Sequence, residues 1–281
     1  MLSTWIYALT SVTVVSLIAL IGIVFIHLRV KKLQRIVSIL VSFAVGALLG
    51  NAIFHLLPEA YETIENTSHV AILFLLGVLV LFVLEKFLHW QHDHSLEAKP
   101  PQIKTFGYIS LFADGFHNFT DGILIGAAWL VSPEIGLATT IAIILHEVPQ
   151  EISDYAILIH AGFSKKKALF VNFMAAISAI MGTLLILIIG TSIEDFSYYI
   201  LPFAAGGFVY LACSDLIPEL HKKNTTKSSL GQFGGIILGI ILMYLISLAG
   251  HHHHTHSHHD HPHTHENSYE HHHEHGEDCE H

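Results

Sequence analysis

The sequence predicts an all-α, polytopic membrane protein with eight transmembrane helices. Of the 281 residues, 52% are hydrophobic and only 13% are charged, and the mean hydropathy of +0.55 is one that soluble domains of this size seldom reach. Several uncharged runs, such as Trp5 to Ile26 and Leu230 to Leu248, have the ~20 residues that a spanning helix needs. The sidedness of the basic residues is a third observation that favours a helical bundle in a bilayer.

Eight apolar segments meet the length requirement, and short connections join them. The expected helices cover residues 4–27, 36–58, 69–88, 106–130, 135–160, 168–190, 196–218 and 230–249. Because the connections leave no room for a separate soluble domain, residues 1–249 should form one bundle. The first apolar run is too long for a secretory signal and follows no basic stretch, so we expect it to be retained. Only two cysteines occur, which argues against a disulfide framework.

The positive charges predict the orientation of the bundle. All 13 Lys and Arg residues lie at or beyond the ends of the first, third, fifth and seventh segments, whereas the alternate connections carry acidic residues. Since the basic residues of short connections stay in the cytoplasm, both termini should lie outside it. No long external segment precedes the first helix, which fits a prokaryotic plasma membrane. We therefore expect a multi-pass protein of the plasma (inner) membrane.

Two segments end in similar sequences. The second ends in HLLPEA at residues 55–60 and the seventh in DLIPEL at residues 215–220, each after a stretch of small residues. The two segments would run in opposite directions, so the match indicates an inverted repeat, which is common in secondary transporters. Alternatively, Pro-Glu merely ends two helices.

The chain changes character after the last apolar segment. Residues 250–281 contain 15 of the 25 histidines, mixed with acidic residues, and cannot form a packed core. We expect a disordered, His-rich tail that binds zinc, nickel or copper weakly, although an expression tag is an alternative. His89, His92, Asp93 and His94 follow the third segment on the opposite face. They would release a metal that the tail collects, or simply form a solvated polar loop.

Polar and ionisable residues lie in the middle of the fourth and fifth segments. Their spacing of three or four residues places each set on a stripe of its helix. The residues are Asp114, His117, Asn118 and Asp121 in the fourth segment, and His146, Glu147, Gln150, Glu151 and Asp154 in the fifth. Ionisable groups at this depth are costly, so they normally face a bundle interior and mark an ion or substrate path.

Facing stripes of imidazole, carboxylate and amide groups would form a cage for a borderline divalent cation. The charge of the cation would offset the desolvation of the carboxylates. Pro149 lacks an N–H, so it should free the carbonyl of Leu145 or kink the helix. Gly115, Gly122 and Gly126 permit close helix approach. The alternative is that these polar groups form only structural hydrogen bonds between helices.

These motifs resemble those of the zinc-iron permease (ZIP) family of metal transporters. HNFTDG at residues 117–122 and HEVPQE at residues 146–151 are similar to the paired metal motifs of its fourth and fifth helices, and the resemblance extends over about residues 5–249. It implies a 3+2+3 bundle, in which the first three and last three helices are related by inversion around helices four and five. It also implies a homodimer, a binuclear site and metal movement toward the cytoplasm.

The resemblance further implies a role for each motif residue. His117, His146 and Gln150 would bind mainly one metal ion. Asn118, Asp121, Glu147 and Glu151 would bind the second ion or bridge the two. Many similar relatives read HExPHE, whereas this chain has Gln150 at the second histidine position. An amide oxygen is a harder and weaker ligand than imidazole, so zinc selectivity over manganese and iron is in question.

The sequence thus predicts a divalent metal transporter, with Zn²⁺ as its substrate and Fe²⁺, Mn²⁺ or Cd²⁺ as alternatives. We expect no catalytic cofactor, no enzyme activity and no nucleic-acid partner. Asp114, Asp154 and His160 would extend the path, or serve only in helix packing. Near helix ends, solvated capping is the expected role of four further residues. They are His55, Glu59, Asp215 and Glu219.

Three other functions are compatible with parts of the sequence. A cation-diffusion exporter would also use the HxxxD spacing of His117 and Asp121, but such exporters typically have six helices. An intramembrane zinc metalloprotease is suggested by HEVPQ, although its second histidine is missing and Pro149 disrupts the helical geometry. A receptor or metal sensor without transport is the third alternative.

Overall fold

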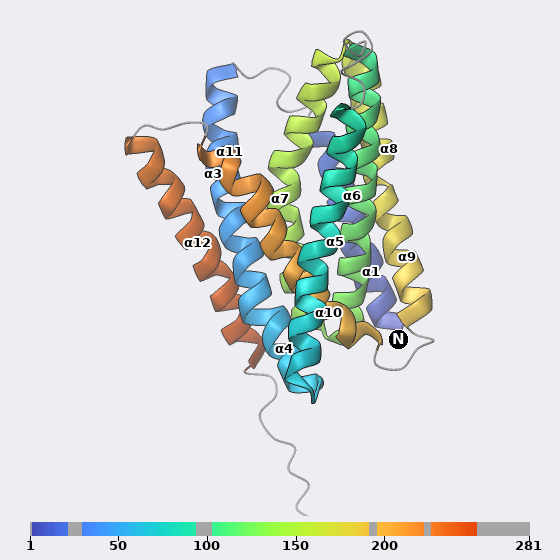
Figure 1. Cartoon of the computed structure of the whole chain (residues 1–281), viewed down its shortest axis with the longest axis vertical. Coiled ribbons are helices and arrows are strands. Elements are labelled where there is room, and N and C mark those ends of the chain that lie inside the picture. Colours follow the sequence, from blue (N-terminus) through green and yellow to red (C-terminus); the bar gives the residue numbers. More distant parts are fainter. Residues whose placement is uncertain (1, 22–29, 94–102, 191–195, 222–225, 252–281) are drawn as a thin grey trace, which may run out of the picture.

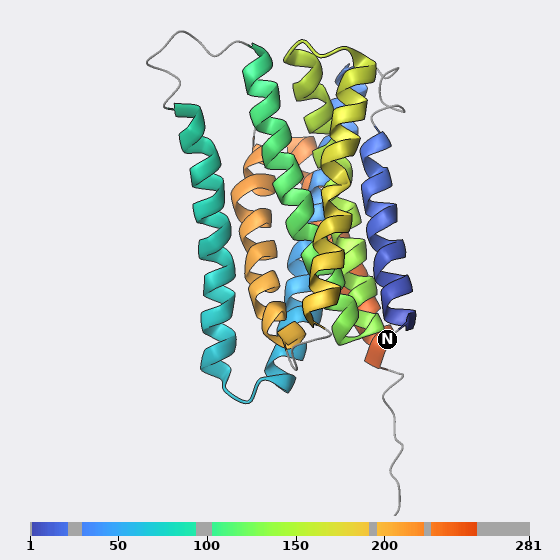
Figure 2. The ribbon, with the colours of Figure 1, turned by 90° about the vertical axis from the view of Figure 1, so that its right-hand side faces the viewer.

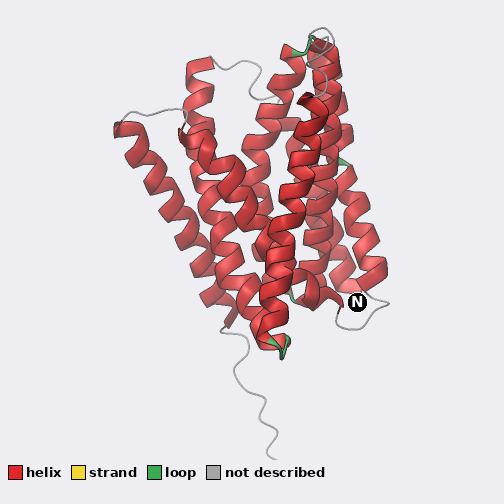
Figure 3. Cartoon of the chain, viewed as in Figure 1, coloured by secondary structure: helices red, strands yellow, loops and turns green. Residues whose placement is uncertain are grey.

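The computed structural model describes residues 2–21, 30–93, 103–190, 196–221 and 226–251, which contain helices and no strand (Figures 1 and 3). The elements are α1 Leu2–Ile18 with the 3₁₀ turn Ala19–Ile21, α3 Val30–Asn51, the π-helical segment Ala52–Leu56, α4 Leu57–Thr63, α5 Thr67–Asp93, α6 Ile103–Val131, α7 Pro133–His160, α8 Lys165–Ala176, α9 Ser178–Gly190, α10 Phe196–Leu211, the π-helical segment Ala212–Leu216, α11 Ile217–His221 and α12 Thr226–His251. Residues 252–281 of the expected His-rich tail and His94 lie outside the described residues, whereas His89 and His92 belong to α5.

The long helices stand side by side in one bundle. Its lower end in Figures 1 and 2 holds the start of α1, the end of α12 and α4, whereas the end of α5 and the start of α6 lie at the upper end. The two termini of the helical bundle therefore share one end. This arrangement is the one that an even number of crossings produces.

Six of the described helical stretches are long and apolar enough to cross a membrane. They are Leu2–Ile21, Val37–Thr63, Thr67–Leu84, Lys165–Gly190, Phe196–His221 and Ser229–Ala249. The remaining long helices, α6 and α7, have 29 and 28 residues, and they carry the polar stripes that lower their hydropathy. The all-helical, polytopic character is confirmed. The count of eight spans and the 3+2+3 arrangement stay predictions.

The two similar motifs have the same local structure. Each proline-glutamate pair follows a five-residue π-helical segment, Ala52–Leu56 before Pro58 and Ala212–Leu216 before Pro218. A proline cannot donate to the carbonyl four residues earlier, which favours such a departure from α-helical bonding. The carbonyl of Phe54 instead accepts a hydrogen bond of 3.3 Å from Ser247 Oγ. In Figure 1, α3 descends toward α4 while α10 ascends toward α11, so the two copies run in opposite directions.

Two pairs of helices cross in matching ways. At the crossing of α3 and α12, a Cβ added to Gly46 would lie 2.0 Å from the carbonyl oxygen of Ile236. At the crossing of α10 and α5, a Cβ added to Gly206 would lie 2.0 Å from the carbonyl oxygen of Phe74. Gly46 and Gly206 are 160 residues apart, like the two motifs. The matching contacts support the prediction of an inverted repeat, with glycine required at both crossings for close backbone approach.

The centre of the bundle is formed by α6 and α7, and α9 packs closely on α6. Thr183 Oγ donates to the carbonyl of Gly122 at 2.8 Å, and a Cβ on Gly122 would lie 1.9 Å from the carbonyl oxygen of Ala179. By contrast, only 11% of the apolar stretch of α5 and 22% of that of α12 are buried. Their exposed faces are apolar, as expected of helices that face lipid. The polar stripes of α6 and α7 thus lie inside.

Candidate metal centre

Four side chains from α6 and α7 meet in the interior of the bundle. His117 and Asp121 come from α6, and His146 and Glu147 from α7, with one ligand atom of each lying within 4.8 Å of the others. His146 Nε2 is 3.0 Å from Asp121 Oδ2 and 3.5 Å from Glu147 Oε1. His117 Nε2 is 3.2 Å from Glu147 Oε1, 3.7 Å from Asp121 Oδ2 and 3.3 Å from His146 Nε2. We call these four residues the imidazole cluster.

Helical spacing and local hydrogen bonds position these side chains. His117 and Asp121 are one turn apart on α6, and α7 runs unbroken through Pro149. His146 Nδ1 lies 3.2 Å from the carbonyl oxygen of Ala142, one turn earlier. Donation to that carbonyl leaves Nε2 as an acceptor that faces the other three residues. His146 and Glu147 are fully buried and Asp121 is 2% exposed, whereas the side chain of His117 is 19% exposed, so three of the four members are shielded from solvent.

The dimensions of the imidazole cluster suit a small divalent cation. Zinc binds imidazole nitrogen and carboxylate oxygen at about 2.0–2.2 Å, so the ligands of a tetrahedral zinc lie about 3.3–3.6 Å apart. The five separations in the cluster span 3.0–3.7 Å. Asp121 Oδ2 and both oxygens of Glu147 are buried, yet within the described chain they accept no well-formed hydrogen bond. Two imidazoles with two such carboxylates are a donor set that zinc prefers.

The other predicted site residues flank this cluster. Asn118 and Glu151 are buried, and Asn118 Nδ2 donates to Asp114 Oδ1 at 2.9 Å. Gln150 is half-buried and lies one turn after His146 on α7. It is not one of the four residues that form the imidazole cluster. Its role stays a prediction. His160, at the exposed end of α7, is not part of the cluster.

Sequence reasoning missed Asn172. This residue of α8 is fully buried, and its Nδ2 donates to Glu151 Oε2. The only signal in the sequence is that one amide stands in an apolar segment, with no partner at helical spacing. A third helix therefore contributes to the polar interior.

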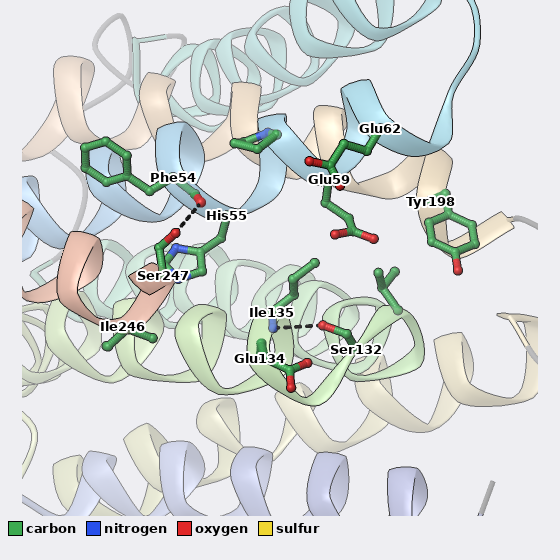
Figure 4. A pocket seen from close by; sticks show the side chains of 12 residues that line it. Phe54, His55, Glu59, Glu62, Ser132, Glu134, Ile135, Tyr198, Ile246 and Ser247 are labelled. Carbon is green, nitrogen blue, oxygen red and sulfur yellow. Dashed lines mark hydrogen bonds between the residues drawn. The ribbon is translucent and has the colours of Figure 1, made fainter. Parts of the chain in front are cut away.

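A second polar feature is a cavity of about 460 Å³ at the lower end of the bundle (Figure 4). The last turns of α12, the start of α7 and the π-helical segment Ala52–Leu56 surround it. Its polar lining consists of His55, Glu59, Glu62, Ser132, Glu134, Tyr198 and Ser247. None of the described lining residues is a lysine or arginine, so the cavity should attract cations.

The burial of His55 corrects one expectation from the sequence. We expected a solvated cap at the helix end, but this imidazole is only 6% exposed. The π-helical segment and the neighbouring α7 and α12 cover it, which helical periodicity could not reveal. Asp215 and Glu219, by contrast, are exposed, as expected of helix-end residues.

Comparisons with known proteins identify the family. A sequence profile described as "ZIP Zinc transporter" matches residues 2–102 and 90–247. The chain belongs to the ZIP zinc transporter family. Among its ZIP relatives, Zinc transporter ZIP13 of Pongo abelii is 33% identical over 268 residues, covering 88% of this chain and 80% of the relative. Zinc transporter zipt-7.2 of Caenorhabditis elegans is 30% identical, covering 87% of this chain and 66% of the relative.

A human relative, Zinc transporter SLC39A7, is 29% identical and covers 76% of this chain and 64% of the relative. ZIP proteins are transporters and not enzymes, so the metalloprotease interpretation is wrong. The family match likewise identifies a ZIP transporter and not a cation-diffusion exporter. As a ZIP protein, this chain is an integral membrane protein, and its relatives indicate zinc as the transported ion.

Proposed function

We propose that this ZIP protein moves Zn²⁺ from the external or lumenal side into the cytoplasm through a binuclear site between α6 and α7. The observation that carries the proposal is the imidazole cluster, in which four ligand atoms lie within 4.8 Å of one another in the bundle interior. Ionisable groups inside a membrane protein normally mark an ion path. The ion is the transported substrate, so the site must bind it with an affinity moderate enough to allow its release.

The first metal position would use the imidazole cluster, and the second would lie beside it. The proposed ligands of the two positions are His117, Asn118, Asp121, His146, Glu147, Gln150 and Glu151. Support for a second position comes from Asn118 Oδ1 and Glu151 Oε1, which are buried and accept no hydrogen bond from the described chain. Amide and carboxylate oxygens are harder donors than imidazole, so Fe²⁺, Mn²⁺ and Cd²⁺ would compete with Zn²⁺ there.

The direction of transport is supported by charge. Basic residues follow the odd-numbered apolar segments, and this pattern predicts that the end shared by the two termini is external. The acidic cavity with Glu59, Glu62 and Glu134 lies at that end, where it would concentrate cations from outside. Residence in a plasma (inner) membrane and assembly as a homodimer belong to the same proposal.

Zinc uptake into proteoliposomes tests this function. Asp121→Ala and His146→Ala should each abolish zinc-dependent flux while the protein stays assembled in the membrane. Thr183→Val is the matched control, because it removes a buried hydrogen bond between α9 and α6 without touching the imidazole cluster. It should retain uptake near that of the unmodified protein. Undiminished flux in the two cluster variants would count decisively against the proposed site.

A further inference from the structure

Asn51 brings an amide into the interior of the bundle, at the point where the end of α3 packs against α7. Its side chain is fully buried, and that of Thr139 on α7 is 1% exposed. Asn51 Nδ2 donates to Thr139 Oγ1 at 3.2 Å. The residues beside them in the chain, Ala52 and Ala138, belong to the buried hydrophobic core. A polar contact thus joins the two helices within apolar surroundings.

The amide of Asn51 is only half satisfied by this contact. Thr139 pairs with its nitrogen, whereas Oδ1 is buried and accepts no hydrogen bond from any residue that the structure describes. Buried polar atoms are normally paired, and an unpaired one destabilises the fold. A leucine of similar size would fill the same space without that penalty, so packing alone does not account for the amide. The lone pairs of Oδ1 are available to a cation.

Helical spacing places Asn51 and Thr139 between the acidic cavity and the imidazole cluster. His55, one turn after Asn51, and Ile135, one turn before Thr139, both line the cavity (Figure 4). In the other direction, His146 follows Thr139 by seven residues, which is about 10 Å along α7. An ion that moves along α7 from the cavity to the cluster therefore passes this pair.

The neighbouring threonine of α7 has other partners. Thr140 Oγ1 donates to the carbonyl of Gly136 at 2.6 Å and accepts a hydrogen bond of 3.2 Å from Trp129 Nε1. These partners belong to α7 itself and to α6. Of the two adjacent threonines, Thr139 is thus the one that faces α3.

Neutral oxygen atoms suit an ion in transit. A divalent cation that leaves water needs other oxygen atoms in place of its hydration shell, and an apolar layer offers none. An amide oxygen and a hydroxyl replace water without adding negative charge, so they bind the ion more weakly than the imidazoles and carboxylates of the cluster do. Weak binding allows rapid passage, which conduction through a membrane requires.

We propose that Asn51 contacts the zinc ion in transit, and that its Oδ1 and Thr139 Oγ1 bind the partly hydrated ion between the acidic cavity and the imidazole cluster. The inference rests on the proposed transport function and adds to it a residue of α3. In the structure the two side chains are buried and bonded to one another. Passage of the ion therefore breaks this hydrogen bond and requires α3 and α7 to separate locally.

Steady-state zinc uptake into proteoliposomes tests the role of Asn51. Asn51→Leu should lower the maximal rate at least fivefold, because it removes the oxygen from the path. The part of the zinc-induced rise in Tm that depends on Glu147 should remain, since the imidazole cluster still binds zinc at equilibrium. Asn51→Asp keeps an oxygen at this position and should retain at least half of the maximal rate.

Ser42→Ala is the matched control on the same helix. Ser42 is fully buried, and its Oγ donates to the carbonyl of Ser38 at 2.7 Å. It faces α12, since a Cβ added to Gly235 would lie 2.8 Å from Ser42 Cβ. The variant loses a buried hydrogen bond of α3 away from α7, so its uptake rate should stay within twofold of that of the unmodified protein.

Cadmium sensitivity of a cysteine variant tests direct contact with the ion. In a background of Cys213→Ser and Cys279→Ser, Asn51→Cys places a thiol beside the path, and a soft sulfur ligand prefers a soft cation such as cadmium. Cadmium should then block zinc uptake at a concentration at least tenfold lower than in the background protein. Ser42→Cys should leave the cadmium sensitivity unchanged.

Four results would each overturn the proposal. They are a loss smaller than fivefold in Asn51→Leu, equal losses in Asn51→Leu and Asn51→Asp, disappearance of the Glu147-dependent rise in Tm in Asn51→Leu, and unchanged cadmium sensitivity in Asn51→Cys. The third result would mean that the substitution damages the imidazole cluster itself. Absence of zinc uptake by the unmodified protein would instead refute the proposed function.

Discussion

The Nε2 atom of His146 lies 3.0 Å from Oδ2 of Asp121, which joins α7 to α6 at the centre of the bundle. Both side chains are buried, and the oxygen accepts no well-formed hydrogen bond within the described chain. We therefore expect the pair to offer two ligand atoms to one ion. Most of the behaviour expected of this ZIP protein follows from that geometry.

Replacing Asp121 by Asn tests the charge of this pair without changing its size. Asp121→Asn should raise the KM for zinc uptake at least ~10-fold, because even an outer-shell partner of a metal ligand typically contributes that much to affinity. Uptake kinetics in proteoliposomes provide the measurement. A KM within twofold of the unmodified value would mean that the carboxylate does not bind the ion.

Zinc should stabilise the folded protein through the imidazole cluster. A ligand at 100 times its Kd adds about 2.7 kcal/mol to the free energy of unfolding, so zinc should raise Tm and a chelator should reverse the rise. Glu147→Gln should remove most of the shift, since Glu147 Oε1 contacts both imidazoles. Scanning fluorimetry in detergent measures it. An equal shift in the variant would assign the stabilisation to another zinc site, such as the histidines of residues 252–281.

Gln150→His should increase selectivity for zinc. An added imidazole one turn after His146 is a softer donor than the amide and favours zinc over manganese. Competitive uptake of the two ions should show a severalfold higher preference for zinc, with a lower KM for zinc. If the ratio is the same in both proteins, Gln150 does not contact the transported ion.

The crossing of α3 and α12 should not tolerate a methyl group. Gly46→Ala places a Cβ 2.0 Å from the carbonyl oxygen of Ile236, so the helices must separate. Such overpacking typically costs about 1–3 kcal/mol, which thermal unfolding should detect as a lower Tm. Gly234→Ala on α12 is the matched control, because beyond its own helix backbone no atom of the described residues lies within 4 Å of its added Cβ. Equal Tm values for both variants would contradict the close crossing.

The chain provides its own test of membrane orientation. Its two cysteines are Cys213, which is exposed, and Cys279 in the C-terminal segment. In a Cys213→Ser variant, a membrane-impermeant thiol reagent should label Cys279 in intact cells, because the charge pattern places the C-terminus outside. Labelling only after permeabilisation would reverse the predicted orientation and the proposed direction of transport.

The sequence by itself determined the helical, membrane-embedded class and the polar residues that share a face of each helix. Apolar runs of sufficient length and spacings of three or four residues are properties of single segments, so His117 and Asp121 could be placed on one stripe without a structure. The resemblance of HNFTDG and HEVPQE to known motifs then indicated the family, which the comparisons confirmed.

Only the tertiary structure decided which stripes meet and what else joins them. Periodicity within one helix does not specify its neighbour or its rotation, which depend on the packing of small residues between helices. The 3.0 Å approach of His146 to Asp121, the contact of Asn172 with Glu151 and the burial of His55 all arise between different helices. Such contacts leave no spacing signal in the chain, because they exist only once the bundle has formed.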